Sequence, residues 1–275
     1  MTMPPIIQLD DVSYRYPDGT AGLTCCSLKI GRGSRTVLMG GNGAGKTTLF
    51  MHLNGIFIPK SGRLLFNGEP YDYSRKGLKI LRSKVGLLFQ NPDSQLFSAT
   101  VREDVSFGPM NLGLAREDVE RRVESALEAT GITAVAERPV HSLSFGQKKR
   151  ACIAGLLAME PEILVLDEAM SGLDRKMRGD LLELLDRLHS RGMTIILSTH
   201  DIDFAYSWAD RIHLLSNGSC EASWDAERLP EFAEQLEANG VGVPEAVKLQ
   251  RLLAERGLLS GDKPLRSVAE ILHKF

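Results

Sequence analysis

The sequence has no apolar segment long enough to cross a bilayer. Its longest uncharged apolar run, residues 151–159, spans nine residues, whereas a membrane-spanning helix needs roughly 20. The opening residues, MTMPP, lack the basic and apolar regions of an export signal. We therefore expect a soluble protein that stays in the cytoplasm.

Cysteine motifs and net charge are also lacking. Cys25, Cys26, Cys152 and Cys220 form no CxxC pair and have no histidine at ligand spacing, so we interpret them as buried reduced thiols without a chemical role. The 33 Lys and Arg residues are balanced by 35 Asp and Glu residues, which leaves a net charge of −2. This balance gives no long-range attraction for nucleic acid, and we expect no nucleic-acid partner.

What the chain does have is the composition of an ordinary globular protein. Its 275 residues, 43% hydrophobic and 25% charged, suffice for one large domain with appendages or for two joined lobes. Short apolar runs of strand length, at residues 36–39, 85–89, 163–166 and 194–198, alternate with helical patterns. That rhythm predicts an α/β fold around a mostly parallel sheet.

Three segments depart from this rhythm. Near the amino terminus, β-rich runs separated by turns, such as residues 28–30 and 63–66, predict a small antiparallel sheet. Residues 91–155 carry amphipathic helical patterns and predict an inserted helical subdomain. Residues 221–275 show short amphipathic helices broken by proline and glycine, with no strand signal, and predict a separate helical appendage.

A phosphate-binding motif lies between an apolar strand and a helix: residues 40–47, GGNGAGKT, match GxxxxGK[ST]. Glycines allow positive φ, so that successive N–H groups and the amino end of the helix can face phosphate oxygens. Lys46 adds a positive charge, and Thr47 offers a hydroxyl to Mg²⁺. An accidental glycine turn is the alternative. We predict nucleotide binding by Gly40, Gly41, Asn42, Gly43, Ala44, Gly45, Lys46, Thr47 and the adjacent Thr48.

Two carboxylates follow the apolar run at residues 163–166. The carboxyl end of a parallel strand is where α/β proteins place their chemistry. Asp167 is predicted to hold Mg²⁺, and Glu168 to orient or deprotonate the attacking water. A solvated acidic turn is the alternative, which the phosphate motif disfavours.

Residues 143–147, LSFGQ, precede another helical stretch. Ser144 and Gln147 have the spacing of a capping box, which prepares a second helix amino end for an anion. If the helical subdomain projects away from the core, this end serves a nucleotide on another copy of the chain, which implies a dimer. An ordinary helix cap explains Ser144 and Gln147 but not Gly146, because glycine costs about 1 kcal/mol inside a helix.

Taken together, these motifs resemble those of the ATP-binding cassette (ABC) family of ATPases. They occur in that family's order: Lys46, Gln90, LSFGQ, Asp167-Glu168, the SGLD segment at 171–174, and His200. The resemblance covers residues 6–220 and implies a P-loop NTPase fold. A RecA-like core with an antiparallel β subdomain would occupy residues 1–90 and 156–220, and the helical signature subdomain residues 91–155.

The resemblance also implies a shared nucleotide site. Two subunits would hold two ATP molecules head to tail. Ser144, Gly146 and Gln147 of one subunit would close over the γ-phosphate held by Lys46 of the other.

Further site residues come from the resemblance alone. Gln90 would touch the lytic water and, with Thr47 and Asp167, the Mg²⁺ ion. His200 would contact the γ-phosphate, and Asp174 would cross the dimer seam. Tyr16 would stack on adenine, with core packing of its ring as the alternative.

A narrower resemblance follows Gln90. The segments NPDSQLF at 91–97 and VREDVSFGP at 101–109 look like those of energy-coupling factor importer ATPases, especially the cobalt or nickel type. This implies an ATP-hydrolysing subunit at the cytoplasmic face of the cell membrane. Its partners would be a second copy of itself or a paralogous ATPase, a transmembrane scaffold subunit and a substrate-binding membrane subunit. A vitamin-type importer and a non-transport ABC ATPase are the alternatives.

Acidic residues in these segments are candidate contacts to the scaffold. Asp93, Glu103 and Asp104 could meet its basic residues, and a solvated acidic face explains them equally well. The tail at 221–275 could add a dimer contact. Gly41 stands where the family often has proline, and we expect it to loosen the phosphate loop slightly. Phe145 replaces a glycine of the signature, a change that removes no reacting group.

Overall fold

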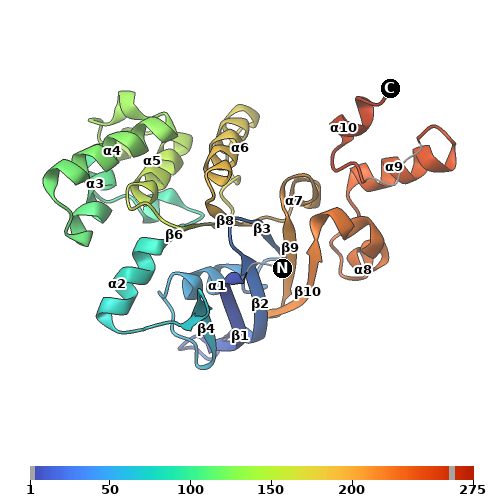
Figure 1. The fold of residues 1–275 in the computed structure, drawn as a ribbon, viewed down its shortest axis with the longest axis horizontal. Coiled ribbons are helices and arrows are strands. Elements are labelled where there is room, and N and C mark those ends of the chain that lie inside the picture. The colour runs from blue at the N-terminus through green and yellow to red at the C-terminus, as the bar shows by residue number, and fades with distance from the viewer. Residues whose placement is uncertain (1–3, 260–263) are drawn as a thin grey trace.

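The computed structural model describes residues 4–259 and 264–275, and these form two sheets with helices around them (Figure 1). A six-stranded sheet has the order β10-β9-β3-β8-β7-β6, in which β9, β3, β8, β7 and β6 run parallel. Its strands are β3 (Arg35–Met39), β6 (Val85–Leu88), β7 (Ile163–Leu166), β8 (Thr194–Ser198), β9 (Arg211–Ser216) and β10 (Ser219–Asp225). β6, β7 and β8 are buried along their whole length, as expected for strands covered on both faces.

The predicted antiparallel sheet is also present, with strand order β2-β1-β4-β5. It consists of β1 (Pro5–Arg15), β2 (Ala21–Gly31), β4 (Ser61–Phe66) and β5 (Glu69–Pro70). β2 ends at Gly31, and β3 of the six-stranded sheet begins at Arg35 after a short turn. The antiparallel sheet therefore leads directly into the strand that precedes the phosphate motif.

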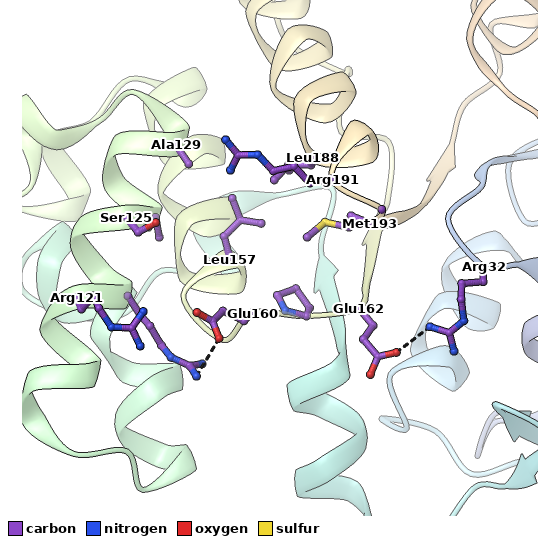
Figure 2. Close-up of a pocket in the computed structure, with 14 residues that line it drawn as sticks. Arg32, Arg121, Ser125, Ala129, Leu157, Glu160, Glu162, Leu188, Arg191 and Met193 are labelled. Carbon is purple, nitrogen blue, oxygen red and sulfur yellow. Dashed lines mark hydrogen bonds and ion pairs between the residues drawn. The ribbon is translucent and has the colours of Figure 1, made fainter.

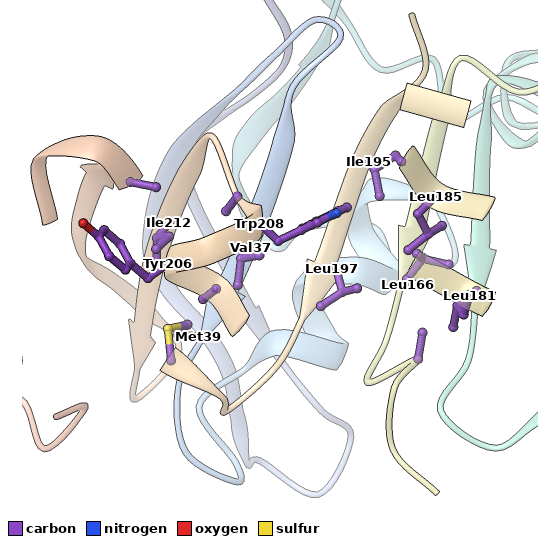
Figure 3. Close-up of a cluster of buried hydrophobic side chains, with 14 of the residues drawn as sticks. Val37, Met39, Leu166, Leu181, Leu185, Ile195, Leu197, Tyr206, Trp208 and Ile212 are labelled. Atoms are coloured by element: carbon purple, nitrogen blue, oxygen red, sulfur yellow. The ribbon is translucent and has the colours of Figure 1, made fainter. Parts of the chain in front are cut away.

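Helices of the core pack against the six-stranded sheet through one apolar cluster (Figure 3). α6 (Arg175–Ser190) contributes Leu181 and Leu185, and α7 (Ile202–Trp208) contributes Trp208. They face strand residues that include Val37 and Leu197, both 0% exposed. α1 (Lys46–Leu53) instead belongs to a second cluster, which it shares with the antiparallel sheet.

The predicted helical insertion contains three α-helices that group together on one side of the molecule (Figure 1). They are α3 (Val101–Leu112), α4 (Arg116–Thr130) and α5 (Phe145–Leu157), with single 3₁₀ turns η1 (Pro92–Ser94), η2 (Thr133–Val135) and η3 (Val140–Ser142). Their buried residues form an apolar cluster of their own. α5 continues to Leu157, so the expected boundary at residue 155 falls inside this helix.

The prediction of a tail without strands is wrong. β10 runs from Ser219 to Asp225 and pairs antiparallel with β9. Its small and polar residues, SCEASWD, gave no apolar alternation, and only Trp224 is deeply buried. The pairing of β10 is therefore a tertiary feature.

The tail is also less separate than expected. After β10 come η4 (Ala226–Phe232), α8 (Ala233–Ala238), α9 (Glu245–Glu255) and α10 (Val268–Leu272). Leu229, Leu236 and Ile271 are 0% exposed and belong to the same apolar cluster as the sheet and α7.

α2 (Arg75–Lys84) was not predicted. Cys25 is exposed and Cys220 partly so, contrary to the expectation that all four thiols are buried. Within the described ranges, no helix has the length and apolarity needed to span a membrane.

Candidate active site

The predicted site residues follow the carboxyl ends of neighbouring parallel strands. The phosphate motif follows β3, Gln90 follows β6, Asp167 and Glu168 follow β7, and His200 follows β8. Because the order β3-β8-β7-β6 makes these strands neighbours, their carboxyl ends meet at one edge of the sheet. The fold thus gathers residues that lie up to 160 positions apart in the sequence, from Gly40 to His200.

The phosphate loop needs its glycines for space and for backbone conformation. Gly40 has φ +149°, and a Cβ atom there would lie 2.4 Å from the carbonyl oxygen of Leu215. Gly45, which precedes α1, has φ +101°, and its Cβ would lie 2.7 Å from the carbonyl oxygen of Gly22. The ammonium group of Lys46 donates to the carbonyl oxygens of Gly40 and Gly41, at 2.7 and 3.0 Å. Lys46 is therefore held directly over the loop.

A chain of hydrogen bonds links the loop to the carboxylate of Asp167 and to the backbone N–H of Glu168. Thr47 Oγ1 donates to Asp167 Oδ2 at 2.6 Å, and Ser198 Oγ donates to Asp167 Oδ1 at 2.7 Å. Ser198 Oγ also accepts the backbone N–H of Glu168 at 2.8 Å. The sequence analysis missed Ser198, because a serine at the end of an apolar strand carries no motif signal until β8 is placed beside β7.

The oxygen atoms of Thr47 and Asp167 suit Mg²⁺, which prefers hard oxygen ligands and a few protein groups beside phosphate oxygens. Asp167 is only 4% exposed, and both of its oxygens already accept hydrogen bonds that fix their direction. The donor set and its fixed geometry therefore fit the predicted ion.

Glu168 has an uncommon backbone conformation, with φ +44°. For a residue other than glycine, this left-handed conformation costs about 1–2 kcal/mol. Its carboxylate accepts a hydrogen bond from Gln90 Nε2 at 3.0 Å, so the two predicted catalytic side chains meet. Glu168 and His200 also line one cavity of about 300 Å³, together with Ser171 and Arg178.

The signature residues form the predicted capping box at the start of α5. Ser144 Oγ accepts the N–H of Gln147 at 3.3 Å, and Gln147 Oε1 accepts the N–H of Ser144 at 3.0 Å. Gly146 is buried, and a Cβ atom there would lie 2.7 Å from the sulfur of Met177 on α6. Close packing against α6 thus explains why glycine stands at this position, an explanation that the sequence analysis did not consider. Asp174 caps α6 by accepting the N–H of Met177 at 2.8 Å.

Tyr16 packs against the phosphate-loop helix. Its hydroxyl lies 2.8 Å from Thr48 Oγ1, and its ring makes edge contacts with Tyr14 and Phe57 at centroid distances of 5.3 and 5.7 Å. The hydroxyl of Thr48 is therefore turned to Tyr16. Tyr16 is half-buried, so the structure supports an anchored ring at the edge of the loop.

Lys149 is a buried residue beside the site that the sequence analysis missed. It is 1% exposed, and its ammonium group donates to the carbonyl oxygens of Ala169 and Ser171 at 2.6 and 2.7 Å. Burial lowers the pKa of Lys149 to about 8. No motif signal marked this lysine, because neighbouring Lys148 and Arg150 make it look like part of an exposed basic run.

The acidic candidates for a partner contact already have local partners. Asp93 pairs with Lys148 at 2.6 Å. Glu103 completes a capping box with Thr100, and Asp104 accepts the N–H groups of Phe97 and Ser98 at 2.9 Å. Glu103 and Asp104 thus order the turn before α3, and Asp93 joins η1 to α5, roles that require no contact with another protein.

A separate cavity of about 470 Å³ lies at the amino ends of β7 and β8, the opposite end from the phosphate loop (Figure 2). Arginines line it, and two of them form ion pairs: Arg122 with Glu160 at 2.9 Å and Arg32 with Glu162 at 3.2 Å. None of the predicted site residues lines this cavity.

The sequence pattern of the ABC transporter family matches residues 23–171, more than half of the chain. The chain belongs to the ABC transporter family. The match begins in β2 and includes the phosphate loop, the signature helix and both carboxylates. The chain is accordingly an ABC ATPase, with the P-loop cassette fold that its motifs predicted.

Relatives of this ABC ATPase include energy-coupling factor proteins. It is 44% identical over 251 residues to the energy-coupling factor transporter ATP-binding protein EcfA of Methanocaldococcus jannaschii, covering 91% of this chain and 90% of that protein. It is 42% identical to EcfA3 of Clostridium perfringens, covering 91% and 88% of the two chains.

Solved structures share the fold of the ABC ATPase. The structure of cbiO1 from Clostridium perfringens, described as part of the ABC transporter complex cbiONQ, has a TM-score of 0.76 and 41% identity, and covers 90% of this chain and all of that one. The cassette MJ0796, solved as a dimer in a post-hydrolysis state with ADP and Pi, has a TM-score of 0.73 and 26% identity, covering 80% and 98%.

Proposed function

We propose that this ABC ATPase is the energising subunit of an energy-coupling factor importer, bound peripherally at the cytoplasmic face of the cell membrane. The observation that carries the catalytic part is the convergence of the phosphate loop, Asp167, Glu168, Gln90 and His200 on one sheet edge. The transport part is supported by the similarity to EcfA proteins over about nine-tenths of the chain.

In this proposal, the phosphate loop binds the triphosphate of ATP through its N–H groups and Lys46. Thr47, Asp167 and the amide oxygen of Gln90 would hold Mg²⁺, which would neutralise charge on the β- and γ-phosphates. Glu168 orients and deprotonates the attacking water, and its hydrogen bond to Gln90 fixes the direction of the carboxylate. His200, in the same cavity, contacts the γ-phosphate.

The proposal places a second subunit over each nucleotide, either another copy of this chain or a paralogous ATPase. Ser144 is exposed at the amino end of α5, where free N–H groups and the helix dipole favour a phosphate. The close packing of Gly146 and the capping bond of Gln147 hold that helix end in its conformation. Asp174, which is exposed at the start of α6, would face the dimer interface. The dimeric form of MJ0796 supports this arrangement.

A groove between the core and the helical group is the proposed docking site for the transmembrane scaffold subunit, which would bring the substrate-binding membrane subunit with it. The groove has a volume of about 580 Å³ and lies among residues of α2, α3 and α5. Phe97 and Phe107 line it, are 63% and 49% exposed, and contact each other edge to face at 4.7 Å. Such exposed aromatic pairs are typical anchors of protein interfaces.

For the cargo, we propose cobalt or nickel ions, on the basis of the segments around η1 and α3 that resemble that importer type. The ions would pass through the membrane subunits and not through this chain. A vitamin-type importer is the second candidate, since the same ATPase type serves both.

The test is reconstitution with the membrane subunits of an energy-coupling factor importer from the same organism. The complex should copurify in detergent and, in proteoliposomes, take up cobalt or nickel only when MgATP is enclosed in the lumen, on the side of the ATPase to which an importer delivers its cargo. Phe97→Ala combined with Phe107→Ala should abolish copurification and uptake while leaving the ATPase activity of the isolated chain intact. Uptake of a vitamin and not of the metals would show that the vitamin is the cargo. Failure to bind any membrane subunit would refute the transport role.

A further inference from the structure

Lys149 connects the signature helix to the loop that carries Glu168. Besides its hydrogen bonds to Ala169 and Ser171, its ammonium group lies 3.5 Å from the carbonyl oxygen of Glu168. Residues 168–172, which directly follow Asp167, are called the carboxylate loop below. One buried cation on α5 therefore binds three main-chain oxygens of this loop.

Burying an ammonium group costs desolvation free energy that an apolar side chain of the same size would not cost. In the described part of the chain, its hydrogen-bond partners are main-chain oxygens and not a carboxylate, although lysine is rarely buried without an ionic partner. A leucine or methionine would fill the same space without the desolvation cost. The lysine is thus suited to holding the loop in one conformation, which apolar packing alone does not specify.

The loop needs such support. Glu168 has φ +44° and Gly172 φ +74°, so both of its ends use left-handed backbone conformations. A residue other than glycine keeps this conformation only when its surroundings enforce it. Ser198 binds the N–H of Glu168 at 2.8 Å, and Lys149 binds carbonyl oxygens on the other side of the loop.

A second contact joins the same two elements. The ring of Phe145, the first residue of α5, packs on the carboxylate loop so closely that a Cβ atom on Gly172 would lie 2.9 Å from its edge. The ammonium of Lys149 lies 5.0 Å from the centre of this ring. The amino end of α5 and the carboxylate loop are therefore packed as one unit.

We propose that Lys149 is a positioning residue that couples the two nucleotide sites of the dimer. The inference rests on the head-to-tail dimer of the proposed function. There, Ser144 at the start of α5 covers the nucleotide held by the partner, whereas Glu168 acts on the nucleotide held by its own subunit. Because Lys149 ties the start of α5 to the carboxylate loop, closure over one nucleotide sets Glu168 beside the other.

The test compares Lys149→Met, which has similar length but no donor, with Lys149→Arg, which keeps donors. We expect Lys149→Met to lower kcat about 10-fold or more, as small misplacements of catalytic groups do. The Kd for ATP should stay within about twofold, since Lys149 does not contact the phosphate loop. We expect a Hill coefficient for ATP above 1 in the wild type and of 1 in Lys149→Met, and Lys149→Arg should restore much of both kcat and cooperativity.

Lys84→Met is the matched control, because Lys84 pairs with Glu162 at 3.1 Å at the amino end of β7, away from the carboxyl edge. It should keep wild-type kcat and cooperativity. If Lys149→Met does not fold, Lys149→Leu, which also lacks a donor, takes its place in the same assays.

Three results would overturn the inference. They are wild-type kcat and Hill coefficient in Lys149→Met, a lower kcat with unchanged cooperativity, and wild-type hydrolysis that is not cooperative. Dimer formation of Glu168→Gln with ATP separates this failure from failure of the proposed function. If closed dimers form there, the dimer stands and only the coupling role is lost; if they do not, the dimer itself is refuted.

Discussion

Ser198→Ala tests whether the hydrogen bonds of Ser198 hold Asp167 and Glu168 in position. Ser198 is 1% exposed, and its hydroxyl serves both Asp167 Oδ1 and the N–H of Glu168. Alanine fits the space but leaves both groups without this partner. Each unsatisfied buried group costs about 1–3 kcal/mol. Since Asp167 keeps its bond from Thr47, we expect a total loss of about 2–4 kcal/mol of unfolding free energy.

The assay is thermal unfolding together with steady-state ATP hydrolysis. A loss of that size should lower the melting temperature by roughly 5–15 °C. Turnover should fall about 10- to 100-fold, because the left-handed Glu168 loses the bond that holds its backbone. Ser190→Ala, which removes an exposed hydroxyl bonded to the carbonyl oxygen of Arg187, should change neither quantity. Wild-type melting and turnover in Ser198→Ala would refute the reasoning.

Three further predictions concern catalysis, the loop and pH. Glu168→Gln should keep ATP affinity in a nucleotide-binding assay, nearly abolish turnover and accumulate closed dimers that size-exclusion chromatography detects. Lys46→Ala should lose nucleotide in the same binding assay. Wild-type turnover in Glu168→Gln would refute the role of Glu168 as the base. Gly41→Pro should raise the melting temperature slightly, because proline restricts the unfolded chain by about 0.4–1 kcal/mol and a side chain at Gly41 meets nothing within 4 Å; an unchanged melting point would dismiss the idea of a loosened loop. Burial lowers the pKa of His213 to about 4, below its value in the unfolded chain. The unfolded state therefore binds the extra proton as pH falls from 7 to 5, and about 2 kcal/mol of unfolding free energy is lost over that range. Urea unfolding of His213→Asn at both pH values should lack this part of the loss, and an identical pH dependence in the variant would contradict it.

The sequence determined the parts of the site whose chemistry is local. The phosphate motif needs glycine at positions with positive φ, and the capping box needs Ser144 and Gln147 three residues apart. Both features are confirmed because they depend on the backbone of one short segment. The buried strands β3, β6, β7 and β8 were predictable for a related reason: a strand covered on both faces is apolar throughout.

Only the tertiary structure decided which residues support these motifs. Ser198 and Lys149 carry no motif signal, and they acquire their roles because β8 lies beside β7 and α5 lies against the carboxylate loop. β10 is polar along most of its length and becomes a strand because the edge of β9 is free to pair with it. The physical reason is common to all three. Hydrogen-bond partners far apart in the sequence satisfy one another only after the chain has folded, so no local pattern records them.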